Sequence, residues 1–244
     1  MSALGYEVRR GYDPKTLKAF SNKPSAGKIL EFIGPSAVGK STLFYSVTDE
    51  LEKDWFLPHH ATSLSDIAFD GTKSYFDVHR QLLLESVARI SRNEKDFWTF
   101  ATSIGYGSRV AKMDILMRRD FPRGFALDEG MFQVFSGDFH TLKNDDLEKI
   151  YSGRSLVFMS AREADTIAKR KMVRYEQMLS TGHLPRTTNY ADMLARSESS
   201  IKHFSSFAEN AKKFGADIIT IFAEDSDHEN RQTVLEFSKT INRS

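Results

Sequence analysis

The sequence predicts an α/β fold in which helices cover both faces of a parallel β-sheet. Two features support this prediction. Short apolar runs alternate along the chain with longer stretches of helical periodicity, and strands that alternate with helices form parallel sheets with both faces buried. In addition, one apolar run leads through a glycine-rich segment into a helical pattern, which is the local order of a strand, a loop and a helix.

The predicted strands are short apolar runs bounded by polar or turn residues. Runs of this length between turn signals are typical of strands in the core of a sheet. The clear ones are Ile29–Ile33, Phe125–Asp128, Leu156–Met159 and Asp217–Phe222, and a weaker one lies near Trp55–Leu57.

The longer segments between these runs show the periodicity of amphipathic helices. Asp145–Glu148 and Ser226–Glu229 have the spacing of N-terminal capping boxes. Gly215, just after two lysines, is a typical signal for the end of a helix. The predicted helices include residues 76–93, residues 95–119, a segment after Ser160 and a segment from Tyr190 to Lys213.

The chain of 244 residues suits one large domain, residues 28–244, preceded by an arm at residues 1–27. Residues 60–123 are longer than a single crossover needs, so they are predicted to form a helical insertion that could wall off a second substrate.

The insertion contains an aromatic cluster with a nearby arginine, namely Phe97, Trp98, Phe100, Tyr106 and Arg109. We favour the interpretation that this cluster belongs to an ordinary helical core, and an acceptor pocket is the alternative.

Composition excludes several classes of partner and chemistry. The net charge is +1, from 34 basic and 33 acidic residues, so no overall field indicates nucleic acid or an anionic membrane as a partner. There is no cysteine, which removes disulfides and thiol catalysis. Residues 1–10 lack the apolar stretch that is typical of a signal peptide, and no apolar run reaches the length of a membrane span. We therefore expect a cytoplasmic protein with no membrane partner, and a homodimer stays open.

Residues Gly34–Ser41 fit the pattern G-x-x-x-x-G-K-[ST]. Between a strand and a helix this pattern predicts a phosphate-binding loop, because the loop amides and the helix N-terminus point donors at phosphate. Lys40 would reach the β- and γ-phosphates, and the Ser41 hydroxyl would hold Mg²⁺. The predicted cofactors are therefore ATP and Mg²⁺, with GTP left open in place of ATP. The predicted nucleotide-binding residues are Gly34, Pro35, Ser36, Ala37, Val38, Gly39, Lys40, Ser41 and Thr42.

A second candidate site follows the predicted strand at Phe125–Asp128. Its carboxylates are Asp128 and Glu129, followed by Gly130. An acidic residue at the carboxyl end of a strand beside a phosphate-binding loop can hold Mg²⁺. Asp128 is the metal candidate, and either Asp128 or Glu129 could take the proton of an attacking hydroxyl.

The third candidate segment is a lid at residues 160–187. Arg162, Arg170 and Arg174 follow the strand at Leu156–Met159, in a stretch with the periodicity of an amphipathic helix. Phosphoryl transfer spreads negative charge over the equatorial oxygens, and guanidinium groups stabilise that charge when a segment closes over the site. We therefore predict that these arginines clamp the transferring group.

These three motifs, in this order over residues 28–223, resemble the small P-loop kinases of the nucleoside-monophosphate kinase group, including thymidylate-kinase-like and deoxynucleoside-kinase-like enzymes. The loop Gly34–Thr42 also resembles that of guanylate kinases. The resemblance implies a P-loop NTPase three-layer sandwich with a five-stranded parallel sheet and a helical lid. It also implies that Ala223–Asp225, after the last strand, lies near the adenine.

The sequence departs from that group where the acceptor is recognised. No Asp-Arg-[Tyr/Phe/His] or Glu-Arg-Ser triplet follows the second strand. The predicted partner is therefore a small-molecule phosphate acceptor whose identity stays open among nucleotides, nucleosides, sugars and other hydroxyl compounds. Asp66 and Asp70 could supply the base, although loop or cap roles are favoured for them.

Other functions of such a loop are less well supported. The Asn-Lys-x-Asp motif of GTPases and the Leu-Ser-Gly-Gly-Gln motif of ABC ATPases are both absent. A motor of the AAA type would use Asp128 as metal ligand and Glu129 to activate water, so an NTP-hydrolysing switch or motor is the main alternative. A nucleotide-binding module without catalysis is disfavoured because Lys40, Ser41 and Asp128 are intact.

Overall fold

The fold is known from a computed structural model, which describes residues 28–57, 73–93, 96–118, 121, 123–180 and 188–243. The predicted arm at residues 1–27 lies outside the described residues. So do residues 60–72 of the predicted insertion, with Asp66 and Asp70, and residues 181–187 of the predicted lid.

The core of the molecule is a five-stranded sheet with the order β2-β3-β1-β4-β5. All the strand pairs are parallel, so the predicted parallel sheet is confirmed. The strands are β1 (Ile29–Ile33), β2 (Trp55–Phe56), β3 (Gly124–Leu127), β4 (Arg154–Ser160) and β5 (Asp217–Phe222).

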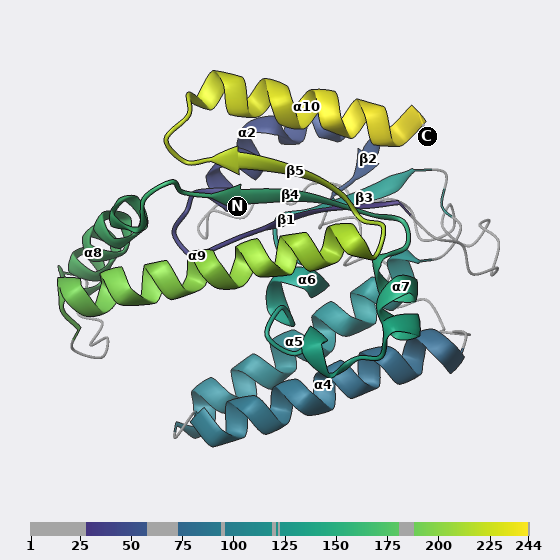
Figure 1. The fold of residues 1–244 in the computed structure, drawn as a ribbon, viewed down its shortest axis with the longest axis horizontal. Coiled ribbons are helices and arrows are strands. Elements are labelled where there is room, and N and C mark those ends of the chain that lie inside the picture. The colour runs from purple at the N-terminus through teal and green to yellow at the C-terminus, as the bar shows by residue number, and fades with distance from the viewer. Residues whose placement is uncertain are drawn as a thin grey trace, which may run out of the picture.

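Helices cover both faces of the sheet (Figure 1). On one face lie α2 (Lys40–Leu51) and α10 (Asp227–Arg243). The helix α8 (Ala164–Ser180) packs beside α9 (Tyr190–Lys213) beyond the carboxyl ends of the strands (Figure 1). The other face carries α4 (Lys73–Asn93), α5 (Phe97–Met117), α6 (Met131–Val134), the 3₁₀ turn η2 (Phe139–Thr141), α7 (Asn144–Tyr151) and α9 (Tyr190–Lys213).

The apolar core is divided between the two faces. One cluster packs α2 and α10 against the sheet through residues such as Phe44 and Val234. The other packs α4, α6, α7 and α9 against the opposite face, and Phe132 lies edge to face with Phe139 and Phe207 in it. Because both faces are covered, all residues of β1, β3 and β4 are buried.

The order of the strands places their carboxyl ends around β1. The chain leaves β1 toward β2 and β3 on one side and later passes to β4 and β5 on the other. Ligands of open parallel sheets bind in the crevice at such a switch point, outside the carboxyl ends of the strands. Among the described helices, none has the length and apolarity of a membrane span.

Several local predictions need correction. The capping box predicted at Asp145–Glu148 is wrong, because α7 begins at Asn144 after Lys143, which makes no side-chain cap. The one at Ser226–Glu229 is confirmed, since Ser226 Oγ accepts the Glu229 N–H at 3.2 Å and donates to the Glu229 carboxylate at 2.9 Å. The ordinary helical core expected around the aromatic cluster is wrong for Phe97 and Trp98, whose exposures are 69% and 76%.

Candidate functional site

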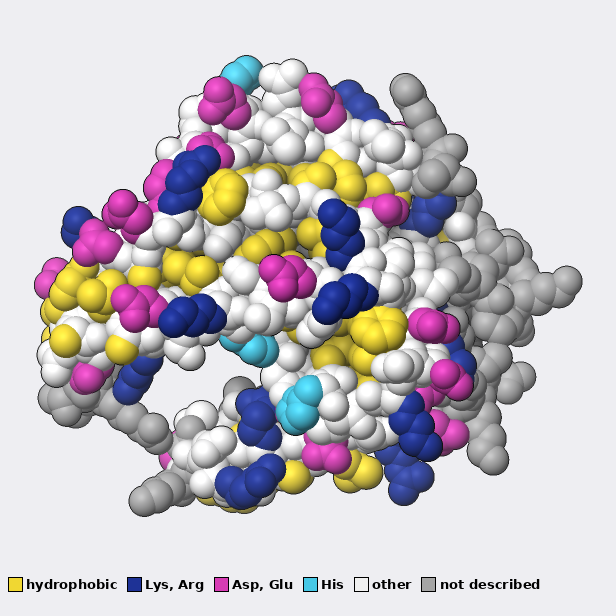
Figure 2. Space-filling view, viewed as in Figure 1, with side chains coloured by type: hydrophobic (Ala, Val, Ile, Leu, Met, Phe, Trp, Pro, Cys, Tyr) yellow, Lys and Arg dark blue, Asp and Glu magenta, His cyan; other side chains and the backbone are white. Residues whose placement is uncertain are grey.

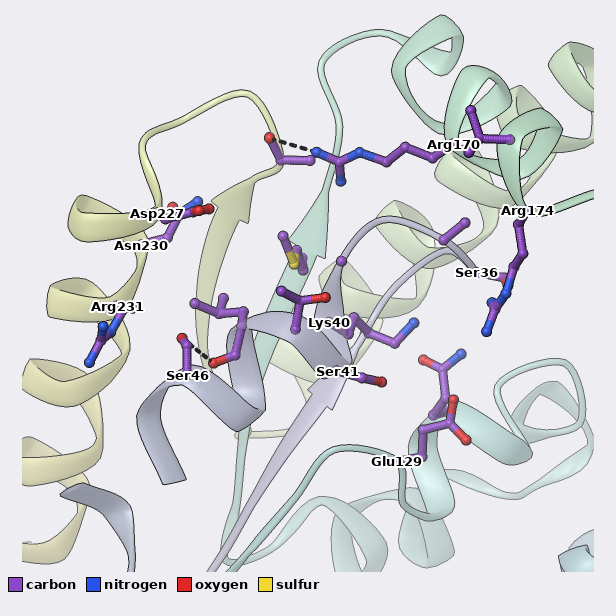
Figure 3. A pocket seen from close by; sticks show the side chains of 18 of the residues that line it. Ser36, Lys40, Ser41, Ser46, Glu129, Arg170, Arg174, Asp227, Asn230 and Arg231 are labelled. Atoms are coloured by element: carbon purple, nitrogen blue, oxygen red, sulfur yellow. Dashed lines mark hydrogen bonds between the residues drawn. The ribbon is translucent and has the colours of Figure 1, made fainter. Parts of the chain in front are cut away.

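The segment between β1 and α2, which we call the glycine loop (Gly34–Gly39), borders a cavity of about 750 Å³. The cavity is walled by residues of the loop, α2, α8 and α10, together with Glu129 and Gln133 (Figure 3). It therefore lies at the switch point of the sheet, where three predicted motifs meet.

Two glycines allow the glycine loop to fold against the end of β4. Gly34 has φ +141° and Gly39 has φ +113°, values that side chains with a Cβ rarely adopt. A Cβ on Gly34 would also collide with the carbonyl oxygen of Met159. The motif glycines are thus required by backbone geometry and close packing.

Lys40, the first residue of α2, is 6% exposed. Its ammonium group donates hydrogen bonds to the carbonyl oxygens of Gly34 at 2.8 Å and Pro35 at 3.0 Å. Burial lowers the pKa of Lys40 to about 8, although the charges of Glu129 and Asp128 act to raise it. The loop therefore holds a desolvated cation whose contacts are neutral carbonyls.

The glycine loop is tied to the other side of the cavity by Gln133 of α6. The Gln133 side-chain oxygen accepts the Gly34 N–H at 3.0 Å, and the Gln133 backbone N–H donates to Glu31 Oε1 at 2.8 Å. Gly130 lies so close to Glu31 that a Cβ there would be 2.6 Å from the carboxyl carbon. The Glu31 carboxylate on β1 thus holds the start of α6 in place, and Gln133 in turn holds the glycine loop.

Between β3 and α6 lies a segment that we call the acidic turn (Asp128–Gly130). Tyr106 of α5 donates to Glu129 Oε2 at 3.0 Å, and Tyr45 of α2 donates to Asp128 Oδ2 at 3.4 Å. Burial and the nearby Glu129 charge raise the pKa of Asp128. Burial and the Glu129 charge likewise raise the pKa of Tyr106, so this phenol stays a donor.

The three predicted lid arginines have different surroundings. Arg170 donates to the carbonyl oxygens of Val38 and of Ala223, the latter at 3.3 Å, and it lines the cavity. Arg174 points into the same cavity from α8 (Figure 3). Arg162 precedes α8, pairs with Asp225 at 2.7 Å and is not among the residues that line the cavity.

The far end of the cavity is formed by the start of α10 and by Ala223. Asp227, Asn230 and Arg231 line it (Figure 3). The Asn230 amide donates to the Phe222 carbonyl at 3.1 Å, which joins α10 to the end of β5. Ala223, predicted to lie near the adenine, is therefore part of this wall, whereas Asp225 is held by Arg162.

A second group of charges, which we call the buried ion network, lies under the site. Arg154 of β4 pairs with Glu31 at 3.0 Å and with Asp114 of α5. Asp114 also contacts His79 at 2.8 Å and Arg118 at 3.0 Å. Burial lowers the pKa of Arg154 to about 10 and raises the pKa of Glu31, although each partner's charge acts against its shift. The network joins α4 and α5 to the strand that leads into the glycine loop.

The structure thus brings Lys40, Ser41, Glu129, Arg170 and Arg174 to one cavity. Asp128 lies next to Glu129 and is bound by Tyr45, as described above. No group of three or more His, Asp or Glu side chains among the described residues could hold a metal ion by itself. Predicted nucleotide-binding residues that line the cavity include Ser36, Ala37, Gly39 and Thr42, whereas Gly34, Pro35 and Val38 supply backbone contacts behind it.

Sequence reasoning missed Gln133, Tyr45 and the buried ion network. A signal for the network was present, because Glu31 is a lone charge in the apolar run Ile29–Ile33. A carboxylate on a strand predicted to be buried needs an internal partner. Gln133 had no such signal, since a polar residue after a turn is ordinary.

These features define an α/β protein with a parallel sheet and a polar cavity at its switch point. No protein-family model matches the chain, and no curated protein is significantly similar to it.

Proposed function

We propose that this protein is an ATP- and Mg²⁺-dependent kinase that transfers the γ-phosphoryl group to a hydroxyl of a small molecule. The observation that carries the proposal is the state of Lys40. It is a buried cation beside the glycine loop, its hydrogen-bond partners in the described part of the chain are two neutral carbonyl oxygens, and it faces a cavity large enough for a nucleotide. A desolvated cation at the N-terminus of a helix attracts phosphate.

The donor nucleotide would lie along the cavity from the glycine loop to α10. Lys40 would exchange its carbonyl partners for phosphate oxygens, and the amides at the start of α2 would add donors. The base would reach the wall that contains Ala223 and Asn230. The cavity is lined by the glycine loop and Lys40 as well as by Ala223 and Asn230, which supports this orientation.

The side chains near Lys40 also suit Mg²⁺. Ser41 lines the cavity, and the Asp128 carboxylate, which is next to the cavity-lining Glu129, accepts the Glu129 backbone N–H at 3.0 Å. Hydroxyl and carboxylate oxygens are hard ligands of the kind that Mg²⁺ prefers, and its remaining positions in kinases are filled by phosphates and water. When bound, the ion would neutralise charge on the phosphates.

In the transfer, the acceptor oxygen forms a bond to the γ-phosphorus while the bond to the bridging oxygen of ADP breaks. The acceptor proton passes to Glu129 or Asp128. Arg170 and Arg174 stabilise the charge on the transferring group. Arg162 would first have to leave Asp225, so we assign the clamp to the two arginines of α8.

Two observations support membership of the small P-loop kinase group. The sheet is five-stranded and parallel, and the G-x-x-x-x-G-K-[ST] segment lies between its central strand and a helix. The main alternative is an NTP-hydrolysing switch or motor, which is favoured by the position of Glu129 in the cavity, where it could activate water. A cytoplasmic location stays a prediction.

The test is ³¹P NMR of the full chain with MgATP and pooled nucleosides, nucleotides, sugars and sugar phosphates. Lys40→Met, which keeps side-chain length without the charge, is the control. A new phosphoester signal together with ADP, absent in the variant, is the expected result. ADP with inorganic phosphate alone would support hydrolysis, and no ADP from the wild-type protein would overturn the kinase.

A further inference from the structure

We propose that Tyr106 of α5 is a positioning residue for phosphoryl transfer, which holds Glu129 so that this carboxylate, and not Asp128, takes the proton of the acceptor hydroxyl. The inference rests on the proposed function and selects the base that this function left open. It is carried by the hydrogen bonds of the two carboxylates, by the lining of the cavity and by the contacts that fix α5.

The two carboxylates of the acidic turn differ in their access to the cavity. Glu129 is exposed and lines the cavity, which also holds the cations Lys40 and Arg174. Asp128 is half-buried and is not among the described residues that line the cavity. Figure 3 shows the side chains of Lys40, Arg174 and Glu129 in the same part of the cavity. An acceptor hydroxyl that reaches a phosphoryl group held by these cations therefore lies beside Glu129.

The hydrogen bonds of the acidic turn leave one carboxylate oxygen available. Both Asp128 oxygens are engaged, Oδ1 by the Glu129 N–H at 3.0 Å and Oδ2 by the Tyr45 hydroxyl at 3.4 Å. Tyr106 donates to Glu129 Oε2 at 3.0 Å, and no other hydrogen bond reaches this carboxylate from the part of the chain that the structure describes. Glu129 Oε1 is therefore the oxygen that can accept a proton from a ligand in the cavity.

The hydrogen bond from Tyr106 determines where Glu129 Oε1 points. The terminal torsion of a glutamate side chain has broad energy wells, so an exposed glutamate without a partner samples many orientations. Burial raises the pKa of Tyr106, and the Glu129 charge adds to this shift, so the phenol keeps the proton that it donates. Because a small misplacement of a reacting group can cost about a hundredfold in rate, a fixed Oε2 matters for catalysis.

Tyr106 can position Glu129 because α5 is itself held in place. Figure 2 shows the molecule hollowed between α9 and the helices α4 and α5, so the position of α5 depends on its other contacts. Gly107 lies against the ring of Phe135, just after α6. Further along α5, the buried Asp114 pairs with Arg154 of β4. The buried ion network thus ties the helix that carries Tyr106 to the central part of the sheet.

The proton transfer fits the bond changes of the proposed reaction. The acceptor oxygen forms its bond to the γ-phosphorus as the bond from that phosphorus to the bridging oxygen of ADP breaks. The acceptor proton passes to Glu129 Oε1 and returns to water when the products leave. Tyr106 keeps its own proton and touches no reacting atom, so removal of its hydroxyl should lower the turnover without weakening MgATP binding.

The test is a double-mutant cycle of Tyr106→Phe and Glu129→Gln, measured as steady-state transfer from MgATP to the acceptor pool used for ³¹P NMR. Tyr106→Phe alone should lower kcat about tenfold, while the KM for MgATP stays within about twofold of the wild-type value. In the Glu129→Gln background, the same substitution should change kcat by less than about twofold, because Tyr106 acts through Glu129. A merely structural role would lower kcat in both backgrounds.

Two other tyrosines provide controls. Tyr190 has the same exposed fraction as Tyr106, 36%, and also donates to a carboxylate, that of Asp165. It is not among the described residues that line the cavity, so kcat of Tyr190→Phe should stay within about twofold of the wild-type value. Tyr45→Phe removes the hydroxyl that is bound to Asp128, and it should lower kcat less than Tyr106→Phe does.

The outcomes separate this inference from the proposed function. The positioning role is overturned if Tyr106→Phe keeps the wild-type kcat, if its effect persists in Glu129→Gln, or if Tyr45→Phe has the larger effect. The kinase survives each of these results when ³¹P NMR shows a phosphoester that depends on Lys40. If the wild-type protein forms no ADP with any acceptor, the proposed function fails, and the positioning role fails with it.

Discussion

The surroundings of Lys40 and the buried ion network contain similar groups in opposite circumstances. Both centre on a buried cation whose pKa is lowered by burial, to about 8 for Lys40 and about 10 for Arg154. Arg154 directly contacts the carboxylates of Glu31 and Asp114. Lys40 contacts two carbonyl oxygens and faces a cavity.

The difference in partners indicates whether a buried cation stabilises the fold or binds a ligand. A buried cation matched by anions within the fold has no need of a ligand, and removing one member leaves the others uncompensated. A desolvated cation that contacts only neutral dipoles gains most from an incoming anion. The comparison therefore predicts that substitutions in the two regions will damage different properties.

The largest effect is expected at Lys40. Replacing it by Met should lower phosphoryl transfer by at least about 10³-fold, because the charge on the transferring phosphoryl group loses a fixed cation. The free energy of unfolding should change by less than about 2 kcal/mol, since only hydrogen bonds to loop carbonyls are lost. Initial rates and urea denaturation measure both quantities, and near-normal transfer would contradict the assignment.

At Arg154 the main expected effect is on stability. Arg154→Met should lower the free energy of unfolding by about 3–5 kcal/mol, because two buried carboxylates lose their shared partner. The control is Lys149→Met, which removes an exposed pair with Asp146 at 3.4 Å and should cost at most about 1 kcal/mol. If urea denaturation gave equal losses for the two variants, the buried ion network would contribute no more to stability than an exposed ion pair.

A smaller effect on catalysis is expected at Arg170. Arg170→Ala should lower the turnover about 10²-fold while the affinity for MgATP changes by about threefold or less, because the guanidinium is needed mainly in the transition state. Lys169→Ala is the control, since Lys169 pairs with Asp165 on the exposed side of α8. A loss confined to nucleotide affinity would place Arg170 in binding instead of catalysis.

The mildest effect concerns pH. With its pKa lowered by burial to about 8, Lys40 is charged below that pH and loses its proton above it. Bound phosphates favour the charged form, so binding takes up a proton at high pH, and MgATP affinity should fall by up to about tenfold per pH unit above pH 8. In Lys40→Arg the guanidinium keeps its charge. Calorimetric titration should show a flat profile for this variant, and a flat wild-type profile would contradict the role of Lys40.

Much of the fold and of the cavity could be predicted from the sequence because the signals are local. The apolar runs that became β1 and β5, the motif Gly34–Ser41, and the cap at Ser226–Glu229 each depend on residues a few positions apart. Backbone geometry and periodicity determine such features before any long-range packing. The position of Asp128 and Glu129 could also be predicted locally, because they directly follow the apolar run that forms β3.

Only the tertiary structure decided which distant groups meet. Glu31 and Arg154 are separated by 123 positions, and Gly34 and Gln133 by 99, so their contacts depend on the order of strands in the sheet. The exposure of Trp98 and the engagement of Arg162 with Asp225 likewise depend on how helices pack. A sequence pattern specifies which faces are apolar, whereas the partners of a buried or surface charge are selected by three-dimensional packing, which local periodicity does not encode.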